Sequence, residues 1–129
     1  MRRDKNDREW QKVKEIVKLR DRGDRILRVL TVKEALLLQR KAPHPYLLRQ
    51  VDPAHIFPVS IYPDQVYNKN NIVMLNRWSH ENLDNMKHPV TGEKISYEER
   101  QEWWKKIAGG HQWVKLMHTL GDKDVEESS

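Results

Sequence analysis

The sequence contains no cysteine and only one phenylalanine among its 129 residues. Without cysteine, the chain can form neither a disulfide nor a zinc site built on thiolates. With so little phenylalanine, the interior must be assembled mainly from Trp, Leu and Ile. Packing of these side chains must therefore hold the fold together without disulfide or zinc cross-links.

Long apolar runs are also absent. No segment approaches the roughly 18 consecutive apolar residues of a membrane-spanning helix. The first ten residues, MRRDKNDREW, carry charges where a secretory signal would carry its apolar segment. We therefore expect a protein that works in the cytoplasm and has no membrane partner. Only 37% of the residues are hydrophobic and 33% are charged, which suits one compact domain with a modest core.

The chain carries a net charge of +5, which is unevenly distributed. Residues 1–50 contain fifteen Lys or Arg and seven Asp or Glu, a net charge of +8, whereas residues 51–129 contain nine and twelve, a net charge of −3. A basic segment of this kind favours a polyanionic partner such as nucleic acid. An ordinary solvated helix surface rich in Lys and Arg is the alternative explanation.

The first part of the sequence has the pattern of two helices. Apolar residues recur at roughly helical spacing over residues 7–19, with Lys and Arg on the other faces. A charged turn that contains a glycine should follow. Thr31 and Glu34 form a capping box that predicts a second helix over residues 32–41, and the prolines after it should end it.

The middle of the sequence predicts the order strand, loop, strand, helix. Residues 47–51 and 54–59 are short apolar runs interrupted by prolines, which is typical of an irregular or edge strand. A loop rich in Pro, Asp and Asn follows. The apolar run over residues 72–75 predicts a second strand, and we expect Ser79 to cap a helix that ends near Pro89.

The last part returns to helices. Ser96 and Glu99 predict the start of a helix over residues 97–107, which two glycines should end. A short amphipathic helix is expected over residues 111–120, ended by Gly121. The expected organisation has four segments: a basic helical arm (1–45), a central unit (46–90), C-terminal helices (91–121) and an acidic, disordered tail (122–129).

The central unit contains three side chains that suit the cleavage of a phosphodiester. Asn71 follows His55 by sixteen residues, and His80 follows Asn71 by nine. Two strands and a helix folded against each other would bring all three to one cleft. An imidazole serves well as the general base for a water molecule near neutral pH. An asparagine amide can fix a loop, orient the base or bind a metal ion, and these three roles stay open.

The segments Ala54-His55-Ile56 and NIVMLNRWSH resemble the HNH endonucleases, also called ββα-metal nucleases. The resemblance covers about a third of the chain, from Val51 to Asp84. It implies an α+β protein in which a small ββα-metal (His-Me finger) core is flanked by N- and C-terminal helices. It also implies the setting of the free-standing phage and bacterial members, some of them homing endonucleases, and hence the cytoplasm of a bacterial or phage-infected host cell.

The resemblance assigns a role to each residue of the motif. His55 would be the general base, and Asn71 would orient His55 or bind the metal ion. His80 would be a metal ligand, and Asp84 stands four residues later on the same helix face, where it can bind the same ion. Many members have an acid directly before the first histidine, but this chain has Ala54 there. Asp52 is the nearest upstream carboxylate and is the candidate replacement.

The implied cofactor is a divalent metal ion, with Mg²⁺ expected first and Mn²⁺ as the alternative. Many family members also carry two cysteine pairs that bind a structural zinc ion. This chain has Asn76 and Ser79 where the second pair would lie, so no structural zinc is expected. Packing by Phe57, Tyr67 and Trp78 should take its place.

The expected partner is DNA, held by cationic side chains that contact its phosphates. The candidates for this role are Lys14, Lys18, Arg20, Arg22, Arg25 and Arg77. The expected activity is metal-dependent hydrolysis of DNA phosphodiester bonds. A monomer would nick one strand, and a homodimer would cut both.

Two other functions fit the same sequence. The first is a non-catalytic nucleic-acid-binding module that keeps the ββα shape, which the alanine at position 54 favours. The second is a phage assembly or packaging accessory protein, in which the helices bind a protein partner.

Overall fold

The computed structural model describes the backbone of residues 2–128 and the side chains of residues 8–121. It contains a two-stranded antiparallel sheet among helices, which is the α+β class expected from the sequence. No helix in the described part of the chain is long and apolar enough to cross a membrane. The elements in chain order are α1 (Arg2–Asp21), η1 (Arg25–Arg28), α2 (Val32–Lys41), α3 (Tyr46–Arg49), β1 (Val51–His55), η2 (Pro63–Gln65), η3 (Lys69–Asn71), β2 (Ile72–Asn76), α4 (Arg77–Asp84), α5 (Tyr97–Ala108) and α6 (Gly110–Ser128).

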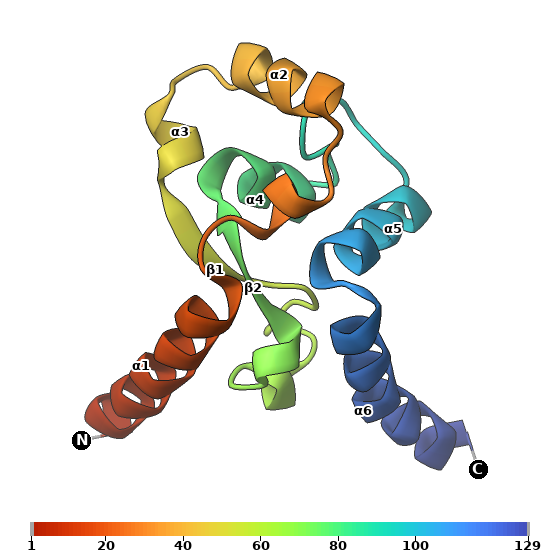
Figure 1. The fold of residues 1–129 in the computed structure, drawn as a ribbon. Coiled ribbons are helices and arrows are strands. Elements are labelled where there is room, and N and C mark those ends of the chain that lie inside the picture. Colours follow the sequence, from red (N-terminus) through yellow and green to blue (C-terminus); the bar gives the residue numbers. More distant parts are fainter. Residues whose placement is uncertain (1, 129) are drawn as a thin grey trace.

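The sheet lies between helices on both of its faces. On one face, α1 packs Val13 and Val17 against Ile72 and Met74 of β2. On the other face lies the main core, to which the sheet, η1, α4, α5 and α6 all contribute buried side chains. Every residue of β2 is buried, which explains why its sequence is an almost continuous apolar run rather than an alternating one. In Figure 1, α1 and α6 diverge on either side of the segment that joins the two strands.

The backbone N–H and C=O groups on the outer edge of β2 form hydrogen bonds with side chains rather than with a third strand. Asp21 accepts a hydrogen bond from the Met74 backbone N–H at 2.9 Å, and Asp24 accepts one from the Asn76 backbone N–H at 3.2 Å. The Ile72 carbonyl accepts from Arg20 at 2.6 Å. Buried backbone groups need such partners, so the polar residues at the end of α1 close the edge that a two-stranded sheet would otherwise leave open.

Several predicted elements are confirmed. The helix α2 spans residues 32–41, and Thr31 and Glu34 form the reciprocal capping box. The strand β2 covers the predicted run over residues 72–75. Ser96 caps α5 by accepting from the Glu99 backbone N–H at 3.1 Å. Gly109 ends α5 with a φ of 83°, a left-handed conformation that glycine adopts readily.

The first strand differs from its prediction. Residues 46–49 form the short helix α3, and β1 runs over residues 51–55, across Pro53 and the gap between the two predicted runs. After β1, the Ile56 N–H still donates to the Asn71 carbonyl at 2.8 Å, and the chain then turns away over residues 58–62. Pro53 is tolerated because β1 pairs with a partner on one edge only.

Two helix ends also differ from their predictions. Asn76, not Ser79, caps α4: its side-chain oxygen accepts from the Ser79 backbone N–H at 2.8 Å. Ser79 lies inside the helix and donates its hydroxyl to the Pro89 carbonyl at 2.9 Å, and α4 ends at Asp84 rather than near Pro89. Gly121 does not end α6, which continues to Ser128. The predicted disorder of the acidic tail falls on residues 122–129, outside the described side chains.

Candidate active site

A pocket of about 360 Å³ opens between the end of β1, the loop that follows it, α4 and α5. Its lining includes His55 from β1, His80 and Asp84 from α4, and Arg100 from α5. Three of the side chains singled out in the sequence therefore meet in one concave site. The antiparallel hairpin and the helix that follows it directly are what bring them together.

His55 is held in one orientation by two contacts. Its Nε2 lies 2.9 Å from the Val66 carbonyl oxygen, and its ring stacks on Trp10 of α1, with centroids 5.5 Å apart and planes inclined by 19°. Because a carbonyl oxygen only accepts hydrogen bonds, the contact with Val66 requires the proton of the neutral ring to be on Nε2. Nδ1 then carries the lone pair, so this geometry leaves Nδ1 as the atom that can take a proton.

Asn71 is fully buried and anchors the loop behind His55. Its side-chain oxygen accepts from the Phe57 backbone N–H at 2.8 Å, and its amide nitrogen donates to the carbonyls of Phe57 at 3.1 Å and Gln65 at 3.3 Å. Of the three roles open to this residue, the structure shows loop fixation. Asn71 acts on His55 indirectly, because the same loop carries Val66.

His80 and Asp84 lie on one face of α4, as the spacing of four predicts. The Nε2 atom of His80 is 3.1 Å from a carboxylate oxygen of Asp84. About a quarter of the His80 side chain and half of the Asp84 side chain are exposed, so both can reach a ligand in the pocket. Together they offer one nitrogen and one oxygen donor.

Arg100 is a pocket residue that the sequence did not indicate. Its Nε donates to the Leu83 carbonyl at 2.5 Å, and its guanidinium carbon lies 5.9 Å from the centre of the Trp104 ring. Burial lowers the pKa of Arg100, and the charge of nearby Asp84 acts in the opposite direction. The residue belongs to α5, outside the motif, so only the packing of α5 against α4 brings its charge to the pocket.

Asp52, the expected replacement ligand in the first strand, is not brought into this pocket. Its carboxylate pairs with Arg77 at 3.2 Å and accepts from the Gln50 amide at 3.0 Å. Neighbouring strand residues point to opposite faces, so Asp52 and His55 are directed apart. Ala54 is fully buried in the main core, which leaves the first strand without a carboxylate at the site.

A divalent ion at this site would rely on α4. Among residues 8–121, no three His, Asp or Glu side chains form a group that could hold a metal ion alone. His80 and Asp84 provide a partial shell, which suits an ion that keeps several waters and takes further oxygens from a substrate phosphate. The donor set therefore fits an open metal site better than a closed one.

The cationic side chains predicted to bind DNA have different surroundings. Lys18 and Arg22 are exposed, whereas the Lys14 ammonium lies 5.7 Å from the centre of the Trp10 ring. Arg77 is engaged by Asp52. Of these four side chains, Lys18 and Arg22 are the exposed ones, and neither takes part in an ion pair among the described residues.

Arg20 and Arg25 have a structural role in addition to their charge. Arg20 binds Asp21 and the carbonyls of Lys69 and Ile72. Arg25 is only 8% exposed and donates to Asp21 at 2.6 Å. Both guanidinium groups therefore hold α1 and η1 against the rest of the protein.

Comparisons with known proteins identify no relative. A scan against protein-family models finds no match, and searches of the curated proteins and of the solved structures find none either.

Proposed function

We propose that this protein is a metal-dependent endonuclease that hydrolyses phosphodiester bonds in DNA. In this proposal, β1, β2 and α4 constitute a ββα-metal core. The observation that carries it is that His55, His80 and Asp84 line one pocket, with the Nε2 contact to Val66 leaving the lone pair of the neutral His55 ring on Nδ1. A resemblance in sequence spacing and an independent geometric arrangement thus support the same chemistry.

The proposed reaction is attack by water on phosphorus. Nδ1 of His55 takes a proton from the water as its oxygen forms the new bond to phosphorus, and the bond to the 3′ oxygen breaks. The leaving oxygen takes a proton from solvent. Arg100 faces the phosphate and offsets its negative charge.

The proposed metal ligands are His80 and Asp84. When bound, a divalent ion would supply charge neutralisation at the phosphate and the leaving oxygen. Mg²⁺ is the first expectation, and Mn²⁺ is the alternative, because both ions suit carboxylate and water oxygens. One such site cuts one strand, so a monomer nicks DNA.

A second candidate function is a non-catalytic DNA-binding module. It is favoured by the burial of Ala54, the position at which many similar nucleases carry a metal-binding acid. The two functions differ in whether the pocket hydrolyses DNA, so one assay separates them.

The test is conversion of supercoiled plasmid to open circles, with Mg²⁺ or Mn²⁺ at neutral pH. We expect the wild type to nick and His55→Ala to lose roughly 10²–10⁴-fold in rate, because it lacks the general base. The exposed His44, outside the pocket, provides the matched control His44→Ala, which should nick at the wild-type rate. Circular dichroism checks that both variants fold.

Asp84→Asn serves as a second variant with almost unchanged shape. We expect it to need a higher metal concentration for half-maximal nicking, since it removes the anionic donor. A wild type that does not nick with either ion, or a His55→Ala variant that nicks as fast as His44→Ala, would contradict the enzymatic proposal.

A further inference from the structure

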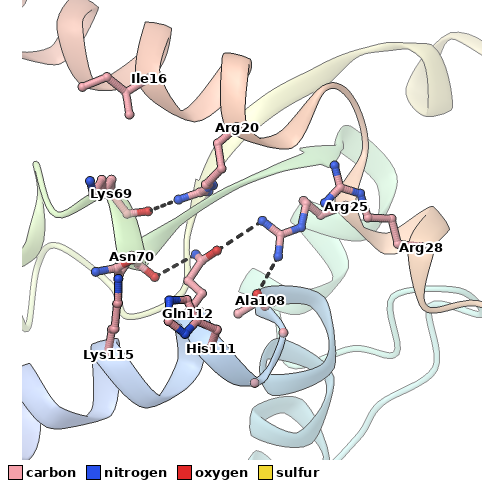
Figure 2. Close-up of a pocket in the computed structure, with 12 residues that line it drawn as sticks. Ile16, Arg20, Arg25, Arg28, Lys69, Asn70, Ala108, His111, Gln112 and Lys115 are labelled. Carbon is pink, nitrogen blue, oxygen red and sulfur yellow. Dashed lines mark hydrogen bonds between the residues drawn. The ribbon is translucent and has the colours of Figure 1, made fainter.

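A second pocket, of about 540 Å³, lies between the end of α1, η1, η3 and the start of α6 (Figure 2). It shares no lining residue with the candidate active site. Pockets that bind small molecules typically have volumes of about 300–1,000 Å³. The pocket is therefore large enough for a phosphate group together with part of a nucleotide.

The lining of this pocket is strongly cationic. No residue that lines it is Asp or Glu. Its five charged members are Arg20, Arg25, Arg28, Lys69 and Lys115. They come from segments as far apart in the sequence as α1 and α6, so the fold gathers them.

Asp21 binds all three arginines behind the pocket, two through its carboxylate and one through its backbone carbonyl. Asp21 is 1% exposed and accepts hydrogen bonds from both Arg20 and Arg25 at 2.6 Å, and its backbone carbonyl accepts from Arg28. Burial raises the pKa of Asp21, but bonds from Arg20, the Met74 backbone N–H and Arg25 lower it by more in sum, so the pKa lies below its usual value. Asp21 is therefore ionised at neutral pH, and it compensates only one of the three guanidinium charges.

Arg25 joins the walls of the pocket. Figure 2 shows its guanidinium directed at Gln112 and at the Ala108 carbonyl, which accept at 3.2 Å and 2.5 Å. Gln112 in turn donates to the Asn70 carbonyl at 2.9 Å. The Arg25 Nε atom is buried and has no hydrogen-bond partner in the structure. The guanidinium of Arg25 is thus fixed in place, with one of its N–H groups unused.

Two lysines add further positive charge at the pocket. Lys69 and Lys115 are exposed, and neither takes part in an ion pair within the part of the chain that the structure describes. Charge-assisted bonds from such side chains bind phosphate oxygens well.

The start of α6 also faces this pocket. Gly109 and Gly110 line it, and a side chain at Gly110 would meet no atom within 4 Å. The first backbone N–H groups of a helix lack intrahelical partners and carry partial positive charge. The helix start therefore adds to the attraction that the five side chains exert on an anion.

We propose that this pocket binds a phosphate of a DNA strand and so anchors the strand at a point separate from the active site. The choice of DNA as the source of the phosphate rests on the proposed nuclease function, whereas the affinity for phosphate rests on the pocket alone.

The test measures DNA binding in EDTA, so that cleavage plays no part. Fluorescence anisotropy of a short labelled duplex compares the wild type with the double variant Lys69→Gln/Lys115→Gln at several salt concentrations. Each phosphate contact contributes about 0.9 to the slope of log K against log salt. We expect the double variant to lower this slope by about 1, because one phosphate contact is lost, and to bind roughly tenfold more weakly at 0.1 M salt.

The matched control is Lys33→Gln/Lys41→Gln, which removes the same charge from exposed lysines of α2. It should keep the wild-type slope, because α2 does not line the pocket. An equal loss in this control would show a general charge effect and overturn the proposal. So would an unchanged slope in the pocket variant.

A second measurement separates a DNA strand from a free anion. Inorganic phosphate is titrated into the wild type and into the pocket variant, and the amide signals of Gly109 and Gly110 are followed by NMR. Shifts in the wild type alone, together with the loss of DNA affinity, support the proposal. Shifts without any loss of DNA affinity would overturn the strand assignment in favour of a small phosphate ligand. A wild type that nicks plasmid while its pocket variant binds DNA normally would overturn this proposal and leave the proposed function intact.

Discussion

At the scale of single residues, the notable feature is how many buried polar side chains bind backbone groups. Asp21, Asn71 and Asn76 are at most 1% exposed, and each accepts a hydrogen bond from a backbone N–H. An unsatisfied buried polar group costs about 1–3 kcal/mol, so these residues are difficult to replace. Asn71 is the most informative of them, because the resemblance to HNH nucleases also allows it a role at the metal.

Asn71→Asp separates a loop anchor from a metal ligand. The new carboxylate would still accept from the Phe57 N–H, but its second oxygen would face the carbonyls of Phe57 and Gln65, to which the amide now donates. We expect the free energy of unfolding in urea to fall by about 2–4 kcal/mol. The neighbouring Asn70→Asp, whose side chain makes no hydrogen bond among the described residues, should change it by less than about 0.5 kcal/mol. Full stability of Asn71→Asp with tighter metal binding would instead support direct ligation.

At the scale of elements, the unit of β2 and α4 determines where the pocket residues lie. The strand passes directly into the helix at Asn76, with no intervening loop. The Asn76 amide donates to a carboxylate oxygen of Asp24 at 2.8 Å while its oxygen caps α4. One side chain therefore connects η1, the end of the sheet and the helix that carries His80.

Asn76→Ala should destabilise the protein by about 1–2 kcal/mol through the lost cap, and by more at neutral than at acidic pH. Burial raises the pKa of Asp24, and the bonds from Asn76 are the main opposing effect. The variant loses the side-chain bond, the larger of the two, and keeps the backbone one. The folded-state pKa of Asp24 therefore rises further, and the folded state loses stability as pH increases through that pKa. Below the ordinary value of 3.8, Asp24 is protonated in both states and only the cap loss remains.

Urea unfolding of Asn76→Ala at pH 7 and near pH 3.5 measures this difference. The control is Ser96→Ala, which removes the cap of α5 without touching Asp24. It should cost about 1 kcal/mol at both pH values. An equal cost of Asn76→Ala at both pH values would show that Asp24 does not depend on Asn76.

At the scale of the whole molecule, one hydrophobic cluster connects parts that the sequence suggested as separate segments. It includes Ile26 of η1, Val73 of β2, Leu83 of α4, Trp104 of α5 and Leu116 of α6. The central hairpin and helix thus have no core of their own, and the flanking helices complete it. A chain with 37% hydrophobic residues has little apolar surface to build two separate cores.

Leu116→Ala tests whether α6 belongs to the same cooperative unit as the sheet. Leu116 is fully buried, so we expect a loss of about 2–5 kcal/mol in the free energy of unfolding. Unfolding should remain a single transition, with coincident curves from tryptophan fluorescence and far-ultraviolet circular dichroism. Two separated transitions would show that α6 unfolds independently. Val114→Ala, at an exposed position of α6, should have little effect.

The sequence by itself determined those helices and strands whose start and end are signalled by residues close together in the chain. The capping boxes, the apolar run of β2 and the glycine after α5 act within a few residues. The helix over 32–41, the start of α5 and its end to within one residue, and the second strand could therefore be predicted. The spacing of His55, Asn71 and His80 indicated a common site in the same way, because a hairpin followed directly by a helix leaves few arrangements.

Tertiary structure alone decided the rest. Asn76 outcompetes Ser79 as a cap because Asp24 and the Pro89 carbonyl engage the two side chains. Arg100 lines the pocket only because α5 packs beside α4. Asp52 does not line it, because its side chain lies on the other face of β1 and pairs with Arg77. The cationic pocket likewise depends on bringing α1 to the start of α6. Such contacts join residues that are far apart in the chain. They therefore produce no local pattern that could be recognised in a single sequence.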